Sequence, residues 1–421
     1  MKIKKRFTLK NGLPVIVAEL GSTEAVTALL LTHTGSRQET PAEAGLSHFL
    51  EHMLFKGTKT WPTSLSLTHF IDSLGADYNA YTDKEVTGYY IKAASEHLPK
   101  MLKLLSEMVW QSLLDPAEMT REKEVIVQEI NMYEDNPLMY VENLLEGVLF
   151  KGSTLGKEIS GTRESVRALT KKQVVNYLER FYHPKNMLLV ISGKTGKSFE
   201  KDIKNNFEVA HAGGKLPIFS SVKGGQGQVV LKYKKTEQAQ LALGIPALPL
   251  RHKDEIVLDV LSVILGGNMS SRLFSRLRER EGLCYFIRSH TTAYERAGAF
   301  VIQAGLDKSK IDKAIGLIKE ELKKVTTELI SDKELNKAKQ YLRGKIILGA
   351  EDSAGVAEWV GRQVLMEHKL QLPQEVIAKI NKVTAADLKR VASAIFKPKC
   401  YNLAVIGPFT NKQKIINWLR K

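Results

Sequence analysis

Hydrophobic residues alternate with polar ones, or recur at every third to fourth position, along most of the chain. Apolar runs of strand character mark residues 12–20, 25–36, 76–94 and 186–193. Apolar residues at helical spacing mark residues 44–55, 96–114, 116–135 and 170–182. Successive strands beside helices predict an α+β fold, in which antiparallel-rich sheets pack against helices.

The pattern of the first half of the chain returns in the second half. Residues 45–54, GLSHFLEHML, align with residues 260–269, VLSVILGGNM, at an offset of 215 residues. Residues 117–130 align with residues 333–346 at an offset of 216 residues. A repeat of this length predicts two homologous copies of one domain.

Between the copies, the periodic pattern gives way to a stretch rich in glycine and serine, which predicts a linker. A chain of 421 residues also suits two domains better than one core. We therefore expect a first domain at residues 1–210, a linker at 211–228 and a second domain at 229–421.

The first copy carries His48 and His52 in a predicted helix, with Glu51 just before the second histidine. Positions four apart share one helix face, so both imidazoles can bind one zinc ion. Glu51 lies on the same side and can act on a water without binding the metal; H-x-x-E-H is the inverted zincin motif. Glu129, 77 residues after His52 in an acid-rich helix, is the candidate third ligand. Glu122, two turns earlier, is placed to support a ligand by hydrogen bonding.

A helix with two solvated histidines would also explain the pentapeptide alone. The second copy argues against this alternative, because it lacks the whole set of candidate residues. In place of His48, Glu51, His52 and Glu129 it has Val263, Gly266, Gly267 and Lys345. Scaffold residues are not expected to disappear together, so the comparison favours a metal site in the first copy and an inactive second copy.

The formal net charge is +16, but the basic residues are interleaved with glutamates, as on solvated helix faces. The sequence lacks the interleaved basic and aromatic residues that are typical of nucleic-acid binding, so we expect no nucleic-acid partner. No apolar run approaches a membrane span or the core of an export signal, so we expect a cytoplasmic protein without a membrane partner. The two cysteines, Cys284 and Cys400, fit a reducing compartment.

The segment AGLSHFLEHMLFKGT resembles the signature of the pitrilysin (insulinase) family of zinc peptidases, and most closely its mitochondrial-processing-peptidase branch. The resemblance runs nearly end to end. It includes LGADYNAYTDKEVTGYY, LGKEISGTRESVRALT and LGGNMSSRLFSRLREREGLCYFIRS. One departure is STLG at residues 153–156, where the family often has HPLG; that histidine is not a metal ligand.

The resemblance implies a zinc endopeptidase that cleaves oligopeptides or unfolded segments in an enclosed chamber. One zinc ion per chain would be held by His48, His52 and Glu129, with Glu51 as general base turned general acid. Arg278 and Tyr285 would steady the peptide carbonyl as its oxygen becomes negative.

The resemblance also implies that the segment at residues 77–83 is an edge strand that accepts the peptide as an added strand. Main-chain hydrogen bonds would be made at Asn79, Ala80 and Tyr81. An ordinary strand is the alternative for this segment.

Larger members of the family join four domains, with the metal in the first and the arginine–tyrosine pair in the last. A chain of two domains then implies a homodimer, or a pair with a paralogous chain, in which each subunit supplies the other's Arg278 and Tyr285. Some relatives are instead non-catalytic structural subunits, and these typically lose part of the motif. This chain keeps all of it, which favours the enzyme.

Overall fold

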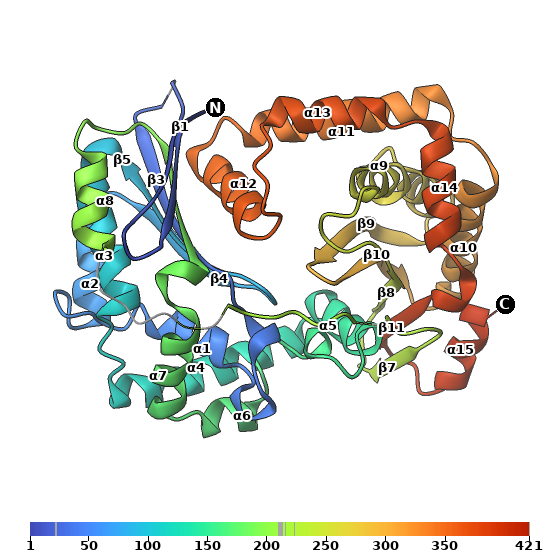
Figure 1. The fold of residues 1–421 in the computed structure, drawn as a ribbon. Coiled ribbons are helices and arrows are strands. Elements are labelled where there is room, and N and C mark those ends of the chain that lie inside the picture. The colour runs from blue at the N-terminus through green and yellow to red at the C-terminus, as the bar shows by residue number, and fades with distance from the viewer. Residues whose placement is uncertain (22, 209–213, 215, 223, 421) are drawn as a thin grey trace. The chain divides into compact units, whose positions relative to one another are not determined.

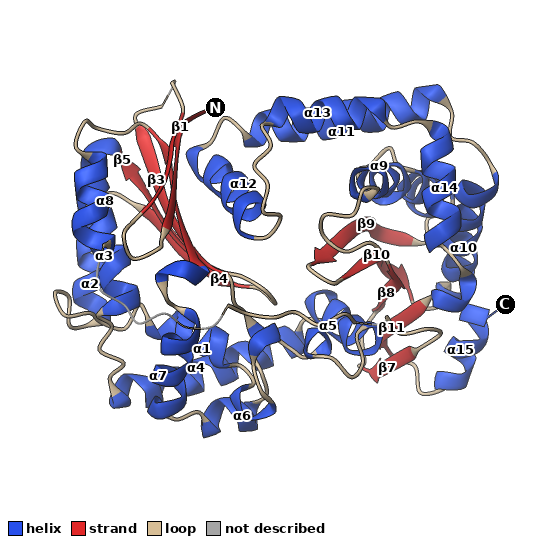
Figure 2. Cartoon of the chain, in the orientation of Figure 1, coloured by secondary structure: helices blue, strands red, loops and turns tan. Residues whose placement is uncertain are grey.

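The computed structural model describes residues 1–420 except residues 22, 209–213, 215 and 223, so part of the predicted linker lies outside the described residues. The chain forms two compact units. Unit 1 comprises Met1–Asn131, Glu158–Ile218 and Ile347–Leu372, and unit 2 comprises Met132–Lys157, Phe219–Ile346 and Pro373–Lys421. Each unit has one sheet packed with helices, which confirms the predicted α+β class (Figures 1 and 2).

The sheet of unit 1 has the strand order β1-β2-β6-β3-β5-β4. β2 and β6 are parallel, and the other neighbours are antiparallel. The strands are β1 (Lys2–Thr8), β2 (Pro14–Glu19), β3 (Ala25–Thr32), β4 (Asp77–Thr82), β5 (Thr87–Ala94) and β6 (Met187–Gly193). β4 lies at one edge, whereas β3 is central and apolar along nearly its whole length, as expected for a strand covered on both faces.

Helices cover both faces of this sheet. On one face, Leu30 of β3 lies in a core with Phe49 and Leu102, which come from α1 (Leu46–Met53) and α3 (Leu98–Trp110). On the other face, β3 packs against α12 (Ser353–Leu365). The other helices of unit 1 are α2 (Ser64–Ser73), α4 (Pro116–Asp135), whose last turn passes into unit 2, α6 (Arg163–Ala168), α7 (Lys171–Phe181) and α8 (Phe199–Phe207).

The sheet of unit 2 repeats the topology of unit 1. Its strand order is β7-β11-β8-β10-β9, with β7 and β11 parallel and the other neighbours antiparallel. The strands are β7 (Val229–Tyr233), β8 (Gln238–Pro246), β9 (Cys284–Tyr294), β10 (Ala297–Asp307) and β11 (Asn402–Gly407). The order matches β2-β6-β3-β5-β4, so the repeat that the sequence predicts is also a repeat of the fold.

Helices also pack around the second sheet, and their apolar faces join one large core with it. They are α9 (Glu255–Gly266), the π-helical segment η6 (Phe274–Arg280), α10 (Ile311–Thr327), α11 (Asp332–Gly349), α13 (Pro373–Lys382), α14 (Ala385–Ile395) and α15 (Lys412–Arg420). None of the described helices combines the length and the apolar content that crossing a membrane requires.

Two helices pack in a different unit from the one that their position in the sequence suggests. α5 (Pro137–Leu149) packs on β8 and β11 of unit 2, and α12 packs on β3 and β6 of unit 1. A Cβ atom at Gly244 would lie 2.8 Å from the side chain of Leu145 on α5, and one at Gly361 of α12 would lie 2.4 Å from Leu31. Each helix thus approaches its sheet where a glycine makes room. The predicted domain boundaries describe the two sequence copies and remain a prediction.

Candidate metal centre

The helix α1 presents an apolar face to the core and a polar face to the site. Leu46, Phe49, Leu50 and Met53 are fully buried, whereas His48 and His52 stand on the opposite side, as the 3.6-residue period requires. Gly45 precedes the helix with a φ of +90°, and a Cβ atom there would lie 2.6 Å from the carbonyl oxygen of Ser160. A glycine is therefore required where the chain enters α1.

A buried glutamate fixes the N-terminus of the same helix. Oε2 of Glu39 accepts a hydrogen bond from the backbone N–H of Gly45 at 2.8 Å, and Oε1 accepts one from Ser47 at 2.7 Å. These are backbone donors that the helix itself cannot satisfy. Burial raises the pKa of Glu39 to about 7, despite these hydrogen bonds. The charge at this helix end therefore depends on pH near neutrality.

The structure brings His48, His52 and Glu129 together. Nε2 of His48 lies 3.3 Å from Nε2 of His52, and each of these nitrogens lies 3.6 Å from Oε2 of Glu129. Ligand atoms bonded to a tetrahedral zinc ion at about 2.0–2.2 Å lie about 3.3–3.6 Å apart. The three side chains therefore fit zinc in both donor type and spacing. Among the described residues, this is the only such group of histidine, cysteine, aspartate and glutamate side chains.

Glu122 orients His52 from behind. Its Oε1 lies 2.8 Å from Nδ1 of His52, and since a carboxylate can only accept, Nδ1 donates and Nε2 is left to face Glu129. Oε2 of Glu122 pairs with Nζ of Lys56 at 2.6 Å. Burial opposes ionisation of Glu122, but its hydrogen bonds with His52 and Lys56 outweigh burial and hold its pKa below the ordinary value.

The two histidines differ in their electrostatic environment. Burial, helped by the neighbouring His52, lowers the pKa of His48 to about 4, so His48 is neutral and has a lone pair for a metal at neutral pH. Burial also disfavours the charged form of His52, but the nearby carboxylates of Glu122, Glu129 and Glu51 outweigh it and raise its pKa. A metal at Nε2 would take the place of that proton.

Glu51 lies beside the three candidate ligands but outside their group. Its Oε2 accepts a hydrogen bond from Oγ1 of Thr82 at 2.6 Å, and no described residue donates to its Oε1. Burial is the main cause that raises the pKa of Glu51, and the charge of Glu129 adds to it. A carboxylate whose charged form is disfavoured in this way is well suited to accept a proton.

Asn79, Ala80 and Tyr81 lie on β4, at the edge of the sheet. β4 pairs on one side with β5, and its outer side has no partner strand among the described residues. The side chain of Tyr81 points away from α1, because its hydroxyl donates to Oε2 of Glu358 on α12 at 2.8 Å. These residues therefore offer the outer edge of their backbone, as β-augmentation requires.

Arg278 and Tyr285 belong to unit 2. The guanidinium carbon of Arg278 lies 5.2 Å from the ring centroid of Tyr285, a cation–π distance, and 72% of the surface of Tyr285 is exposed. Arg278 lies on the π-helical segment η6, a rare geometry that is frequent at functional sites.

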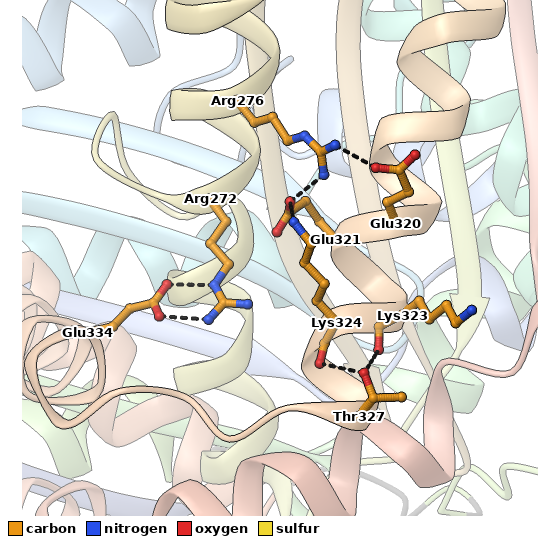
Figure 3. Close-up of polar contacts among 8 residues, drawn as sticks. All are labelled: Arg272, Arg276, Glu320, Glu321, Lys323, Lys324, Thr327 and Glu334. Carbon is orange, nitrogen blue, oxygen red and sulfur yellow. Dashed lines mark hydrogen bonds and ion pairs between the residues drawn. The ribbon is translucent and has the colours of Figure 1, made fainter.

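Two neighbouring arginines connect this part of the chain to the helices of unit 2. Arg272 forms two parallel hydrogen bonds of 2.7 Å with Glu334 on α11 (Figure 3). Arg276, within η6, pairs with Glu320 and Glu321 on α10, the latter at 2.6 Å (Figure 3). Paired guanidinium and carboxylate groups of this geometry fix the direction of the segment that carries Arg278.

The second copy has no room for a matching site. Gly266, which aligns with Glu51, lies so close to β9 that a Cβ atom would be 2.6 Å from the backbone nitrogen of Ser289. Even an alanine would collide there. Gly266 thus serves close packing of α9 against β9.

Sequence reasoning did not identify Thr82 or Glu39. Each contacts α1 from a distant part of the fold or from an irregular turn, and neither belongs to a motif with fixed spacing. For Glu39, the only available signal was a glutamate shortly before the helix. Thr82 lay within the expected edge strand at residues 77–83, but nothing in that pattern connected it to Glu51.

Comparison with known proteins agrees with this geometry. Residues 15–163 match the family described as Insulinase (Peptidase family M16), and residues 168–342 match the Peptidase M16 inactive domain. The chain is 34% identical over 412 residues to the uncharacterized zinc protease YmxG of Bacillus subtilis, covering 97% of this chain and 99% of the relative. It is 31% identical to the uncharacterized zinc protease SCO5738 of Streptomyces coelicolor, covering 97% and 90%.

A solved structure shares the fold. The crystal structure of a protease from Helicobacter pylori superimposes with a TM-score of 0.88 at 25% identity, covering 96% of this chain and 99% of that one. The predicted family is thereby confirmed over nearly the whole chain. This protein belongs to the insulinase family of peptidases, family M16.

Proposed function

We propose that the protein is a zinc-dependent endopeptidase that cleaves oligopeptides or unfolded segments. The observation that carries the proposal is the group formed by His48, His52 and Glu129, whose ligand atoms have the spacing of a tetrahedral zinc site. Glu51 stands beside that group without belonging to it, as a general base must. Relatives at 31–34% identity carry the name zinc protease.

His48, His52 and Glu129 would hold one zinc ion per chain, and Glu122 would fix the tautomer and direction of His52. Zinc supplies Lewis acidity, which polarises a carbonyl group and brings the pKa of water to about 7. Glu51 accepts a proton from the attacking water while the oxygen of that water bonds to the peptide carbonyl carbon. Glu51 then returns the proton to the amine nitrogen as the C–N bond breaks.

The peptide would bind as an added strand on β4, hydrogen-bonded to the backbone at Asn79, Ala80 and Tyr81. Such pairing depends little on sequence, which suits a peptidase of unfolded segments. Arg278 and Tyr285 would donate to the carbonyl oxygen as it becomes negative. The homodimer, the enclosed chamber, the cytoplasmic location and the likeness to processing peptidases are further parts of this proposal.

A direct test uses the purified chain with zinc and a library of quenched fluorescent peptides. We expect cleavage at internal bonds, identified by mass spectrometry of the products. A chelator should abolish it and added zinc should restore it. A zinc-loaded protein that cleaves no peptide would favour the alternative, a non-catalytic structural subunit of the family.

A further inference from the structure

The hydroxyl of Thr82 is the hydrogen-bond donor that holds Glu51. Thr82 is the last residue of β4, and its Oγ1 lies 2.6 Å from Oε2 of Glu51 on α1. Hydrogen bonds of this length between a hydroxyl and an ionised carboxylate are charge-assisted and stronger than neutral ones. The bond joins an edge strand to the helix of the candidate metal centre, over 31 residues of sequence.

The backbone that carries this hydroxyl is fixed from both faces of the sheet. Tyr81 and Thr82 are consecutive on a strand and therefore point to opposite faces. Tyr81 donates to Glu358 of α12 at 2.8 Å, while Thr82 reaches Glu51 on the other face. Thr82 also pairs with Thr87 of β5, whose buried Oγ1 donates to the carbonyl oxygen of Thr34 at 3.0 Å.

We propose that Thr82 is a positioning residue for the base, orienting the carboxylate of Glu51 toward the group formed by His48, His52 and Glu129. A glutamate side chain has several rotatable bonds, and a fixed donor on Oε2 restricts their rotation. Oε1, to which no described residue donates, then remains available to the reacting water. This inference rests on the proposed function.

The same contact connects substrate binding to the base. The residues proposed to pair with the peptide, Asn79 to Tyr81, come directly before Thr82 on the strand. A peptide added to β4 would therefore bind to the same strand that already holds the carboxylate of Glu51 in place.

The test compares Thr82→Val, which keeps the shape but removes the hydroxyl, with Thr82→Ser, which keeps the hydroxyl. In zinc-loaded protein, Thr82→Val should lower kcat about 10–100-fold, the range for partners that orient a catalytic group by hydrogen bonding. KM and zinc affinity should change much less, because the hydroxyl belongs neither to the main-chain groups proposed to bind the peptide nor to the proposed metal ligands. Thr82→Ser should recover most of the lost kcat.

Thr27→Val is the matched control. Thr27 lies on β3 of the same sheet, and its buried hydroxyl bonds to Ser353 of α12 at 2.8 Å, away from Glu51. This variant loses a comparable hydrogen bond and should keep the wild-type kcat. If it loses as much kcat as Thr82→Val, a general weakening of the sheet explains both, and the inference fails.

A second measurement does not depend on activity. In metal-free protein, the infrared carboxyl band that disappears in Glu51→Gln should shift in Thr82→Val and return in Thr82→Ser. Wild-type kcat in Thr82→Val, or an unshifted band, overturns the inference while the peptidase stands. A wild-type protein that cleaves nothing with zinc bound overturns the proposed function itself, and the role of Thr82 in it.

Discussion

Nδ1 of His52 and Oε1 of Glu122 lie 2.8 Å apart, and their hydrogen bond determines which nitrogen of His52 faces the other candidate ligands. Removing the carboxylate in Glu122→Ala should weaken zinc binding about 10–100-fold, as for other outer partners of metal ligands. Chelator competition measures this affinity. Glu124→Ala is a matched control, because Glu124 lies two residues away on α4, is exposed and pairs with Arg167. If the two variants bind zinc with equal affinity, Glu122 does not support the binding of the metal.

The base and the ligands are distinguished by what each substitution does to the metal. Glu51→Gln keeps the shape but cannot take up a proton, so kcat should fall by about 10²–10⁴-fold while zinc stays bound. His52→Ala and Glu129→Gln should lower zinc occupancy as well as activity. Metal analysis beside peptide kinetics checks both. Loss of zinc in Glu51→Gln together with full activity in Glu129→Gln would reverse the assignment.

Glu39 predicts a pH dependence of stability. Its pKa rises from the ordinary 4.5 to about 7 on folding, so the native state binds more protons than the unfolded state between these values. The free energy of unfolding should therefore fall as pH rises through that window, by at most about 1.4 kcal/mol per pH unit for one proton. Chemical denaturation of metal-free protein at several pH values measures it.

The variant Glu39→Gln has no carboxyl group that can titrate, so the contribution of residue 39 to the pH dependence of stability should vanish. The variant should therefore gain stability relative to wild type as pH rises from about 5 to about 8. Glu179→Gln, at an exposed position of α7, is the control and should follow the wild-type profile. A constant difference between wild type and Glu39→Gln would show that Glu39 is charged throughout.

The predicted homodimer is tested by mixing two inactive variants, Glu51→Gln and Tyr285→Phe. In a mixed dimer, the Tyr285→Phe chain brings an intact zinc site, and the Glu51→Gln chain brings an intact pair of Arg278 and Tyr285. If the pair acts on the partner's site, mixing restores one working site per mixed dimer. Activity that stays at background after subunit exchange has been demonstrated would contradict the shared site.

Regular elements were predictable because their signals are local. The helix expected at residues 116–135 is α4, Pro116–Asp135, since its apolar spacing and its start at a proline act within a few turns. The segment 76–94 forms β4 and β5 with a turn between them. The repeat was also visible, because two copies keep the same apolar rhythm.

The candidate metal group was predictable for a related reason. His48, Glu51 and His52 lie within two turns of one helix, so their common side follows from helical geometry. Glu129 needed the chain to bring α4 beside α1, and only its distance from His52 and its acid-rich helix indicated it. The structure places its Oε2 3.6 Å from both histidine nitrogens.

The sequence by itself determined the helices, the strands, the duplication and the residues whose chemistry suits a metal, because these depend on local periodicity and residue type. Only the tertiary structure decided that Thr82 contacts Glu51, that Glu39 holds the start of α1, and that α5 and α12 pack on the sheets of units 2 and 1. The physical reason is that such contacts arise when distant segments bury their apolar faces together. The spacing of residues within one helix or strand does not predict which polar groups this packing brings into contact.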